Sequence, residues 1–119
     1  SRSNSSIINI SSALGHVGSH NRTVYCMTKF GVEGFTKALA IDLAKYKIRV
    51  NAIAPTAIMT PMLKKYYSKD FEKKTIPNIL LNRIGRVDDV ASTAVFLASN
   101  AAKFITGTSL LVDGGWTAK

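Results

Sequence analysis

Three short apolar runs are separated by longer amphipathic segments along the chain. β-Branched residues dominate positions 7–10, apolar and polar residues alternate over 48–54 until Pro55, and a third apolar run covers 109–112. Each run has the length and composition of a strand, whereas the segments between them have the helical period. Strands that alternate with helices form parallel βαβ units. The sequence therefore predicts an α/β fold, with about three strands of a doubly wound parallel sheet and flanking helices.

The segment over residues 23–45 predicts one long helix. Its apolar positions recur at spacings of three and four, so they form one stripe. The stripe consists of Val32, Phe35, Leu39 and Leu43. Glu33 and Lys37 stand four residues apart, in the order that favours an ion pair on the helix surface. Gly31 and Gly34 each weaken a helix, which favours a close approach by another backbone there, such as that of a partner helix.

Two more segments complete the predicted secondary structure. Residues 60–74 are polar, basic and aromatic and lack a clean apolar stripe. Their place after the second predicted strand indicates a mobile lid made of short helical turns. A further helix is expected to open at Asp88 and Asp89, because acidic side chains stabilise the first turn of a helix.

Composition narrows the class of protein. The chain has 119 residues, 46% of them hydrophobic and 19% charged, which suits one compact unit and excludes disordered and collagen-like chains. No window approaches the roughly 18 consecutive apolar residues of a membrane span, so we expect no membrane partner. Cys26 is the only cysteine, which excludes an internal disulfide and fits a reducing, cytoplasmic compartment. The net charge of +9 is spread over several segments without a nucleic-acid-binding motif, so no nucleic-acid partner is expected.

Polar residues that follow the predicted strands are the candidates for chemistry, because ligands of such sheets bind beyond the carboxyl ends of the strands. Ser12 follows the first strand, and Tyr25 and Lys29 stand four residues apart on one face of the long helix. A phenol titrates at about pH 10, and a nearby ammonium favours the phenolate, so this pair suits proton transfer. Ser12 can donate a hydrogen bond to a carbonyl oxygen. The three groups suit reduction of a ketone, or oxidation of a secondary alcohol, with hydride from a cofactor.

Other sites that the same region could form lack a required partner. Cys26 could be a nucleophile with His16 or His20, but no positioned base is evident. Ser12 lacks the Gly-x-Ser-x-Gly turn of a hydrolase. His16 and His20 stand four residues apart in a glycine-containing loop without a third ligand, so no metal site is expected. Loop residues that line a substrate cleft are the better interpretation of both histidines.

Four ordered motifs resemble the short-chain dehydrogenase/reductase family. Its Tyr-x-x-x-Lys signature stands at residues 25–29, and Ser12 precedes the tyrosine by 13 residues in an Asn-Ile-Ser-Ser context. The block after the next strand reads Val-Asn-Ala-Ile-Ala-Pro-Thr at residues 50–56, and the C-terminal motifs are Gly-Thr at 107–108 and Asp-Gly-Gly at 113–115. The motifs span nearly the whole chain, so their joint match is specific. A weaker likeness to xylulose and other carbonyl reductases is carried by Pro-Thr at 55–56, Val-Tyr-Cys at 24–26 and Thr-Lys at 28–29, and the chain also resembles 3-oxoacyl-carrier-protein reductases.

The resemblance implies a role for each matching residue. Tyr25 is expected to give and take the proton, Lys29 to favour the phenolate and bind the nicotinamide ribose, and Ser12 to hold the substrate oxygen. Further contacts to the cofactor, NAD or NADP, are expected from Pro55, Ile58 and Thr60. Thr56 stands where the family usually has glycine. Because threonine disfavours a positive φ, this departure concerns only the backbone angle at that position.

The resemblance also implies a division of the protein. Residues 1–119 are expected to be the C-terminal, catalytic half of one Rossmann-like domain, because the Gly-rich turn that holds the dinucleotide phosphates is not in this sequence. The implied function is an NAD(P)-dependent oxidoreductase that acts on a carbonyl or secondary alcohol, with a sugar, polyol or sugar acid favoured. The alternatives are a 3-oxoacyl-carrier-protein reductase and an inactive truncated fragment or scaffold. The isolated chain is expected to be inactive, and the complete protein to be a homodimer or homotetramer.

Overall fold

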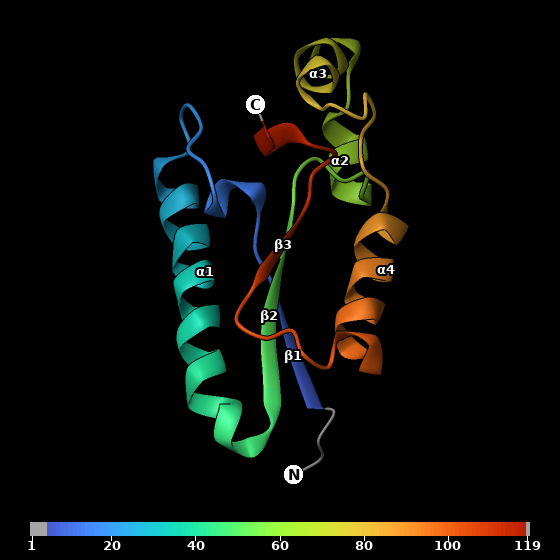
Figure 1. Ribbon diagram of the computed structural model, residues 1–119. Coiled ribbons are helices and arrows are strands. Elements are labelled where there is room, and N and C mark those ends of the chain that lie inside the picture. The colour runs from blue at the N-terminus through green and yellow to red at the C-terminus, as the bar shows by residue number, and fades with distance from the viewer. Residues whose placement is uncertain (1–4, 119) are drawn as a thin grey trace.

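The fold is an α/β arrangement of three strands between two helical layers, in a computed structural model that describes residues 5–118 (Figure 1). The strands are β1 (Ser5–Ile10), β2 (Ile48–Pro55) and β3 (Ser109–Val112). The α-helices are α1 (Thr23–Leu43), α2 (Pro61–Tyr66), α3 (Lys69–Thr75) and α4 (Val87–Ala98). Short 3₁₀ turns are η1 (Ala13–Gly15), η2 (Ala44–Tyr46), η3 (Ile76–Asn78), η4 (Asn100–Ala102) and η5 (Trp116–Ala118).

The sheet is parallel and has the order β1-β2-β3. Ile8 is paired with Asn51, and Ile53 with Leu110. α1 covers one face of the sheet and α4 the other, while α2 and α3 lie beyond the carboxyl ends of the strands (Figure 1). The predicted fold class, the three strands and the order of elements are confirmed.

The core on the α4 side is small and is centred on β2. Ile53, Leu97 and Ala102 form its fully buried cluster. Asn51 is also fully buried, and its amide accepts a hydrogen bond from the N–H of Thr108 and donates one to the carbonyl of Ile105. This side chain therefore fixes the loop that leads into β3, which explains why an asparagine stands inside an apolar strand.

The buried face of α1 differs from the predicted apolar stripe. Glu33, Thr36 and Ala40 face the sheet, whereas Phe35 is 56% exposed. Small and polar residues are buried because the loop after β1 lies directly on the helix: a Cβ added to Gly15 would lie 2.9 Å from Cγ of Glu33. Of the four residues in the predicted apolar stripe, Val32, Leu39 and Leu43 are half-buried, whereas Phe35 lies outside the face that packs on the sheet.

The predicted surface pair of Glu33 and Lys37 is also wrong. Glu33 turns inward, and the ammonium of Lys37 donates instead to the carbonyl of Gly107 at 3.2 Å. Among residues 5–118, Gly31 and Gly34 meet no close backbone from another element, because a Cβ added at either would have no heavy atom within 4 Å outside its own stretch of helix. Their approach to a partner helix stays a prediction.

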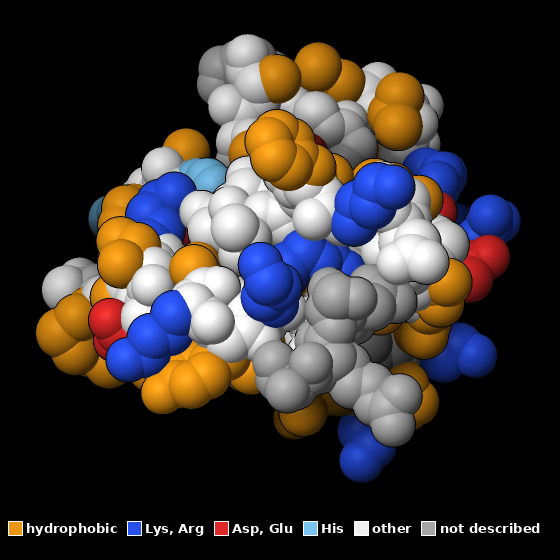
Figure 2. Space-filling model, turned by 60° about the horizontal axis from the view of Figure 1, so that its bottom comes forward, with side chains coloured by type: hydrophobic (Ala, Val, Ile, Leu, Met, Phe, Trp, Pro, Cys, Tyr) orange, Lys and Arg blue, Asp and Glu red, His pale blue; other side chains and the backbone are white. Residues whose placement is uncertain are grey.

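The described residues leave much apolar surface uncovered. The radius of gyration is 15.4 Å, compared with about 13.5 Å for a compact domain of this length. β1 is an edge strand of the described sheet, and its Ile7 and Ile10, which point to opposite faces, are 36% and 53% exposed. Figure 2 shows Lys and Arg side chains scattered over one face between apolar side chains, without one continuous basic patch. Among the described residues, no helix is both long and apolar enough to cross a bilayer.

Candidate functional site

Ser12 occupies the turn directly beyond the carboxyl end of β1. It is the N-cap of η1, and its Oγ accepts a hydrogen bond from the N–H of Leu14 at 3.1 Å. A serine hydroxyl has one proton and two acceptor lone pairs. Because the backbone N–H occupies one lone pair, the hydroxyl proton of Ser12 remains to be donated to a substrate oxygen.

Tyr25 and Lys29 lie in the first two turns of α1, at the same end of the sheet. Their spacing places them on one helix face, and the Nζ of Lys29 lies 5.6 Å from the centre of the Tyr25 ring. Tyr25 is partly exposed, as a group that must reach a substrate has to be. The two side chains are therefore neighbours, and the effect of Lys29 on the phenol oxygen of Tyr25 stays a prediction.

The segment after β2 brings the predicted cofactor residues to this end as well. Pro55 ends the strand, and Ile58 forms an isolated parallel bridge with Gly85. In this bridge the N–H of Gly85 donates to the carbonyl of Ala57, and the N–H of Met59 donates to the carbonyl of Gly85. The backbone N–H of Ile58 therefore points away from Gly85. Gly85 packs closely here, because a Cβ added there would lie 2.5 Å from Cδ1 of Ile58 and would require that side chain to move. Ile58 therefore presents a backbone donor at the carboxyl edge of the sheet.

Thr56 does not strain the backbone of this segment. The non-glycine residues with positive φ in the described chain are Asn21, Lys47 and Asn82. Thr56 is not among them, so the replacement of the family's usual glycine requires no left-handed conformation.

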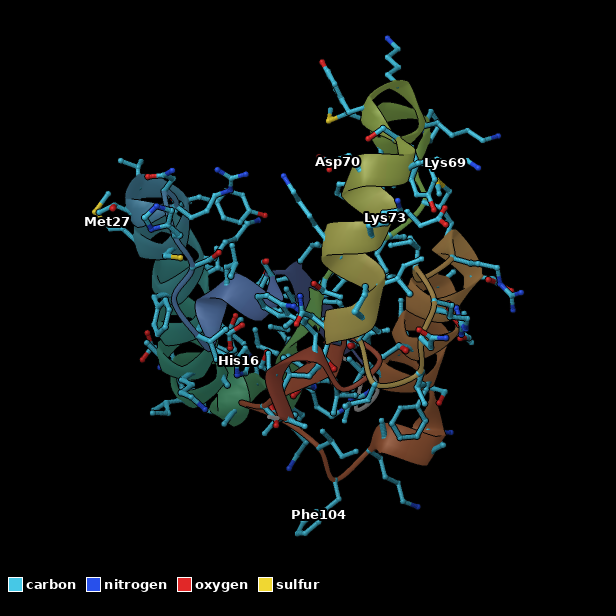
Figure 3. All side chains as sticks on the ribbon, turned by 90° about the horizontal axis from the view of Figure 1, so that it is seen from above. His16, Met27, Lys69, Asp70, Lys73 and Phe104 are labelled. Carbon is cyan, nitrogen blue, oxygen red and sulfur yellow. The ribbon has the colours of Figure 1, made fainter. Side chains whose placement is uncertain are left out.

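Thr60 begins the predicted lid. Its Oγ1 accepts a hydrogen bond from the N–H of Leu63 and caps α2, and Ser68 caps α3 in the same way. The predicted short helical turns are thus present as two helices, and the role of this segment as a lid stays a prediction. Seen from above the carboxyl ends of the strands, Lys69 of α3 and Met27 of α1 lie on opposite sides of the molecule (Figure 3).

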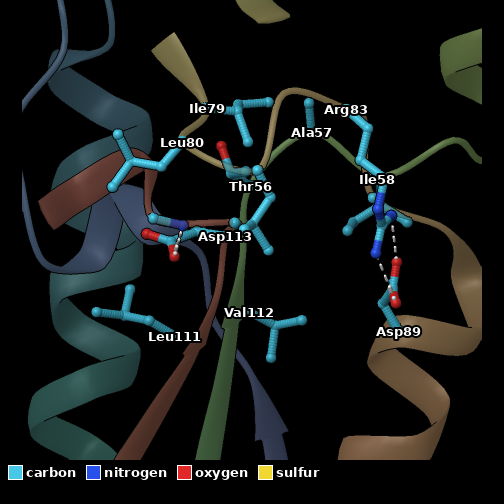
Figure 4. Close-up of a pocket in the computed structure, with 14 residues that line it drawn as sticks. Thr56, Ala57, Ile58, Ile79, Leu80, Arg83, Asp89, Leu111, Val112 and Asp113 are labelled. Carbon is cyan, nitrogen blue, oxygen red and sulfur yellow. Dashed lines mark hydrogen bonds and ion pairs between the residues drawn. The ribbon is translucent and has the colours of Figure 1, made fainter.

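A pocket of about 450 Å³ opens between the ends of β2 and β3 (Figure 4). It is lined by Thr56 and Ile58, by the segment 79–85 and by the turn 113–115. Gly114 and Gly115 have positive φ, and a Cβ on either would lie within 2.7 Å of Ile79 or Leu80. The Asp-Gly-Gly motif is thus a close-packed turn that forms one wall of the pocket. Ser12, Tyr25 and Lys29 are not part of the pocket wall.

Two carboxylates of this pocket have lowered pKa values. The hydrogen bond from Arg83, with help from the N–H of Arg86, lowers the pKa of Asp89 to about 2. Burial alone would raise the pKa of Asp113, but hydrogen bonds from the N–H and hydroxyl of Thr117 and from the N–H of Gly115 outweigh it. Both carboxylates are therefore charged acceptors with structural partners rather than acids poised for proton transfer.

The sequence did not reveal a polar network beside the site. His16, which follows η1, lies 3.0 Å from the hydroxyl of Ser109 and 3.4 Å from the carboxylate of Glu33. These residues come from a loop, a strand and a helix, so no local pattern connects them. The burial of a glutamate on the inner face of α1 was the missing signal, and it is visible only once the helix is docked.

Comparison with known proteins agrees with this geometry. The sequence profile described as "Enoyl-(Acyl carrier protein) reductase" matches residues 1–117. The chain belongs to the short-chain dehydrogenase/reductase family. Among solved structures of this family, 4-hydroxyisoleucine dehydrogenase complexed with NADH superposes with a TM-score of 0.92 at 36% identity, covering 96% of this chain and 47% of that one.

Curated members of the family include several different enzymes. The trans-4-hydroxycyclohexanecarboxylate dehydrogenase of Sinomonas cyclohexanicum is 42% identical over 95% of this chain and 41% of its own length. The L-xylulose reductase of Mus musculus is 41% identical over 94% and 46%. A candidate 2-deoxy-D-gluconate 3-dehydrogenase from Agrobacterium tumefaciens, solved with bound NADP, has a TM-score of 0.90 at 39% identity, over 96% and 47%. The chain thus spans about half the length of these relatives.

Proposed function

We propose that this chain carries the catalytic residues of an NAD(P)-dependent oxidoreductase that interconverts a carbonyl compound and a secondary alcohol. Ser12 donates its hydroxyl proton in a hydrogen bond to the reacting oxygen. Tyr25 gives a proton to that oxygen during reduction and takes it back during oxidation. Lys29 stabilises the phenolate that remains on Tyr25. The observation that supports this proposal is that Lys29 lies beside Tyr25 on one face of α1, while a Ser12 whose hydroxyl is oriented by the N–H of Leu14 follows β1 at the same end of the parallel sheet.

The residues present fit the nicotinamide half of a dinucleotide cofactor. Ile58 offers a backbone donor for a carboxamide oxygen, because its bridge to Gly85 leaves that N–H unused. The Oγ1 of Thr60 already accepts from the N–H of Leu63, so its hydroxyl proton can be donated to a cofactor oxygen. Lys29 would bind the ribose, and Pro55 would shape the turn between the strand and Ile58. The cofactor, when bound, supplies or accepts the hydride.

We propose a polar substrate with several oxygen atoms, such as a sugar, polyol or sugar acid. The lid from Thr60 onward has five lysines among residues 60–77, which favour an anionic or strongly hydrated molecule. Two relatives are named for hydroxy acids and one for xylulose, which supports this class. A 3-oxoacyl group on a carrier protein is the second candidate, supported by the 43% identity to the 3-oxoacyl-[acyl-carrier-protein] reductase of Thermotoga maritima over 94% of this chain and 45% of that protein. The third is a chain that keeps the fold without activity.

We also propose that these residues work together with a nucleotide-binding half and as a homodimer or homotetramer. β1 is an edge strand of the described sheet and carries exposed apolar side chains, so a further strand of the same sheet would pair with its free backbone edge. The exposed Gly31 and Gly34 of α1 would permit close packing of a partner helix. On this account residues 1–119 alone are marginally stable, bind no NAD or NADP and do not turn over substrate. A cytoplasmic location is part of the same proposal.

The test is a substrate and cofactor survey of the full-length protein. Absorbance of NADH and NADPH would be followed with xylulose, gluconate-type sugar acids, cyclic hydroxy acids and a 3-oxoacyl carrier protein. The proposal predicts turnover with at least one polyol or hydroxy acid and a weaker response to the acyl substrate. Tight cofactor binding by residues 1–119 in isothermal titration would contradict the division into two halves. Failure of the full-length protein to bind either dinucleotide would favour the inactive chain.

A further inference from the structure

A carboxylate, a hydroxyl and an imidazole meet between α1, β3 and the loop after η1. Glu33 is 9% exposed, and its Oε2 accepts a hydrogen bond from the hydroxyl of Ser109 at 2.9 Å. The Nε2 of His16 lies 3.0 Å from the same hydroxyl oxygen and 3.4 Å from the carboxylate. In the view from above, His16 lies beside α1 and the C-terminal segment (Figure 3). Three parts of the chain that are distant in sequence are thus joined by one cluster.

The direction of each hydrogen bond follows from counting protons. A carboxylate only accepts, and a serine hydroxyl has a single proton to give. Because Ser109 gives that proton to Glu33, the Nε2 of His16 must be the donor to the oxygen of Ser109. The chain of donors therefore runs from His16 through Ser109 to Glu33, and the buried carboxylate receives the charge-assisted bond that its burial requires.

The cluster has the composition of a hydrolytic triad but not its geometry. In a triad, one ring nitrogen of the histidine faces the serine and the other faces the acid. Here the Nε2 of His16 faces both partners, and the hydroxyl of Ser109 donates to Glu33 rather than to the imidazole. Ser109 is therefore a relay between two side chains and has no activated oxygen.

The network reaches the candidate active site through the backbone of η1. The N–H of His16 donates to the carbonyl of Ala13, and the N–H of Gly15 donates to the carbonyl of Ser12. The same turn rests on α1, since a Cβ on Gly15 would lie 3.0 Å from the carbonyl oxygen of Lys29. Movement of His16 away from Glu33 would therefore change where Ser12 stands relative to Lys29.

We propose that His16, Ser109 and Glu33 form a positioning network that holds the Ser12 turn against the helix that carries Tyr25 and Lys29. The proposal rests on the proposed function for its catalytic consequence, but the ordering of the turn does not depend on it. The hydrogen bond from Ser12 to the reacting oxygen is strongest in the transition state, when negative charge grows on that oxygen. Loss of the network therefore lowers kcat more than it raises KM.

The test compares Ser109→Ala with Thr36→Val in the full-length protein. Thr36 is also a buried hydroxyl between α1 and the sheet, where it bonds to Asn9 and Val32, but it does not touch the Ser12 turn. We expect kcat of Ser109→Ala to fall between about tenfold and a hundredfold with little change in KM. Ser109→Thr keeps the hydroxyl and should restore most of kcat, and Thr36→Val should leave kcat near the wild-type value.

Hydrogen exchange supplies a readout that needs no substrate. The amides of Gly15, His16 and Val17 are bonded within the turn and should exchange faster in Ser109→Ala and in Glu33→Gln than in Thr36→Val. Unchanged exchange in both network variants would overturn the proposal, as would an equal loss of kcat in Thr36→Val. If the wild-type protein shows no turnover, the proposed function fails, while the exchange comparison still decides whether the network orders the turn.

Discussion

Gly15 offers a sharp test of how closely the Ser12 turn is fitted to α1. A Cβ added there would lie 2.8 Å from Oγ of Ser11, 2.9 Å from Cγ of Glu33 and 3.0 Å from the carbonyl oxygen of Lys29. The first two are side-chain atoms that can rotate, whereas the third belongs to the helix backbone. The Gly15→Ala variant therefore has to move the turn away from the helix by several tenths of an ångström.

The magnitude follows from the cost of overpacking. Insertion of one carbon into a well-packed contact destabilises a fold by about 1–3 kcal/mol, and we expect the free energy of unfolding of Gly15→Ala to fall by that amount. Displacement of Ser12 adds a kinetic effect, since a shift of about 1 Å in a catalytic group can cost up to a hundredfold in rate. We expect kcat to fall by about tenfold or more with a smaller change in KM.

Denaturant unfolding and steady-state kinetics of the full-length protein measure both effects. Gly18→Ala is the matched control, because a Cβ at Gly18 in the same loop would have no other heavy atom within 4 Å. That variant should keep the stability and kcat of the wild type. If Gly15→Ala and Gly18→Ala had the same unfolding midpoint and the same kcat, the fitted contact between the turn and α1 would be refuted.

Three further predictions concern charge, assembly and the lid. The pKa of Asp89 is lowered to about 2 by its bond with Arg83, so its stabilising effect is complete above the ordinary carboxyl pKa and is lost as the pH falls. The melting temperatures of wild type and Asp89→Asn should therefore differ most at neutral pH, and the difference should shrink to zero as the pH falls from about 4 to about 2. A difference that stays constant over this range would contradict the prediction. Gly31→Ala should raise the free energy of unfolding of the monomer by about 1 kcal/mol, because alanine has the higher helix propensity. The same substitution should weaken any oligomer in which a partner helix packs at this position, as measured by light scattering. Unchanged assembly would contradict the expected contact with a partner helix. Replacement of both Lys64 and Lys65 by serine should raise KM for the substrate and reduce the dependence of KM on salt. An unchanged KM at low salt would indicate that these lysines are solvated surface residues that do not contact the substrate.

The strands and the signature residues could be predicted from the sequence because local patterns specify them. β-Branched and alternating runs gave all three strands to within two residues at each end, and the spacing of Tyr25 and Lys29 fixed their common helix face. The N-caps Thr60 and Ser68 explain why the lid forms two short helices. These features depend on neighbours in the chain, so a linear pattern records them.

The orientation of α1 could not be predicted in the same way. Its apolar residues suggested a stripe through Phe35, but the helix packs on the sheet through Glu33, Thr36 and Ala40. The buried carboxylate of Glu33 has polar partners from other segments, namely the hydroxyl of Ser109, a strand residue 76 positions later, and the imidazole of His16. Such a pairing depends on the docked geometry of three segments, and for that reason the positioning network was also missed.

The most direct test of the central claim is kcat of Tyr25→Phe compared with Tyr46→Phe in the full-length protein. Both tyrosines are about half exposed and have a lysine ammonium near the ring, 5.6 Å away for Tyr25 and 5.2 Å for Tyr46, but Tyr46 lies in η2 at the opposite end of the sheet. Loss of a general acid and base should lower kcat of Tyr25→Phe by about 10²–10⁴-fold, with cofactor affinity almost unchanged and Tyr46→Phe close to wild type. Near-wild-type turnover by Tyr25→Phe would contradict the assignment of the proton-transfer role to Tyr25.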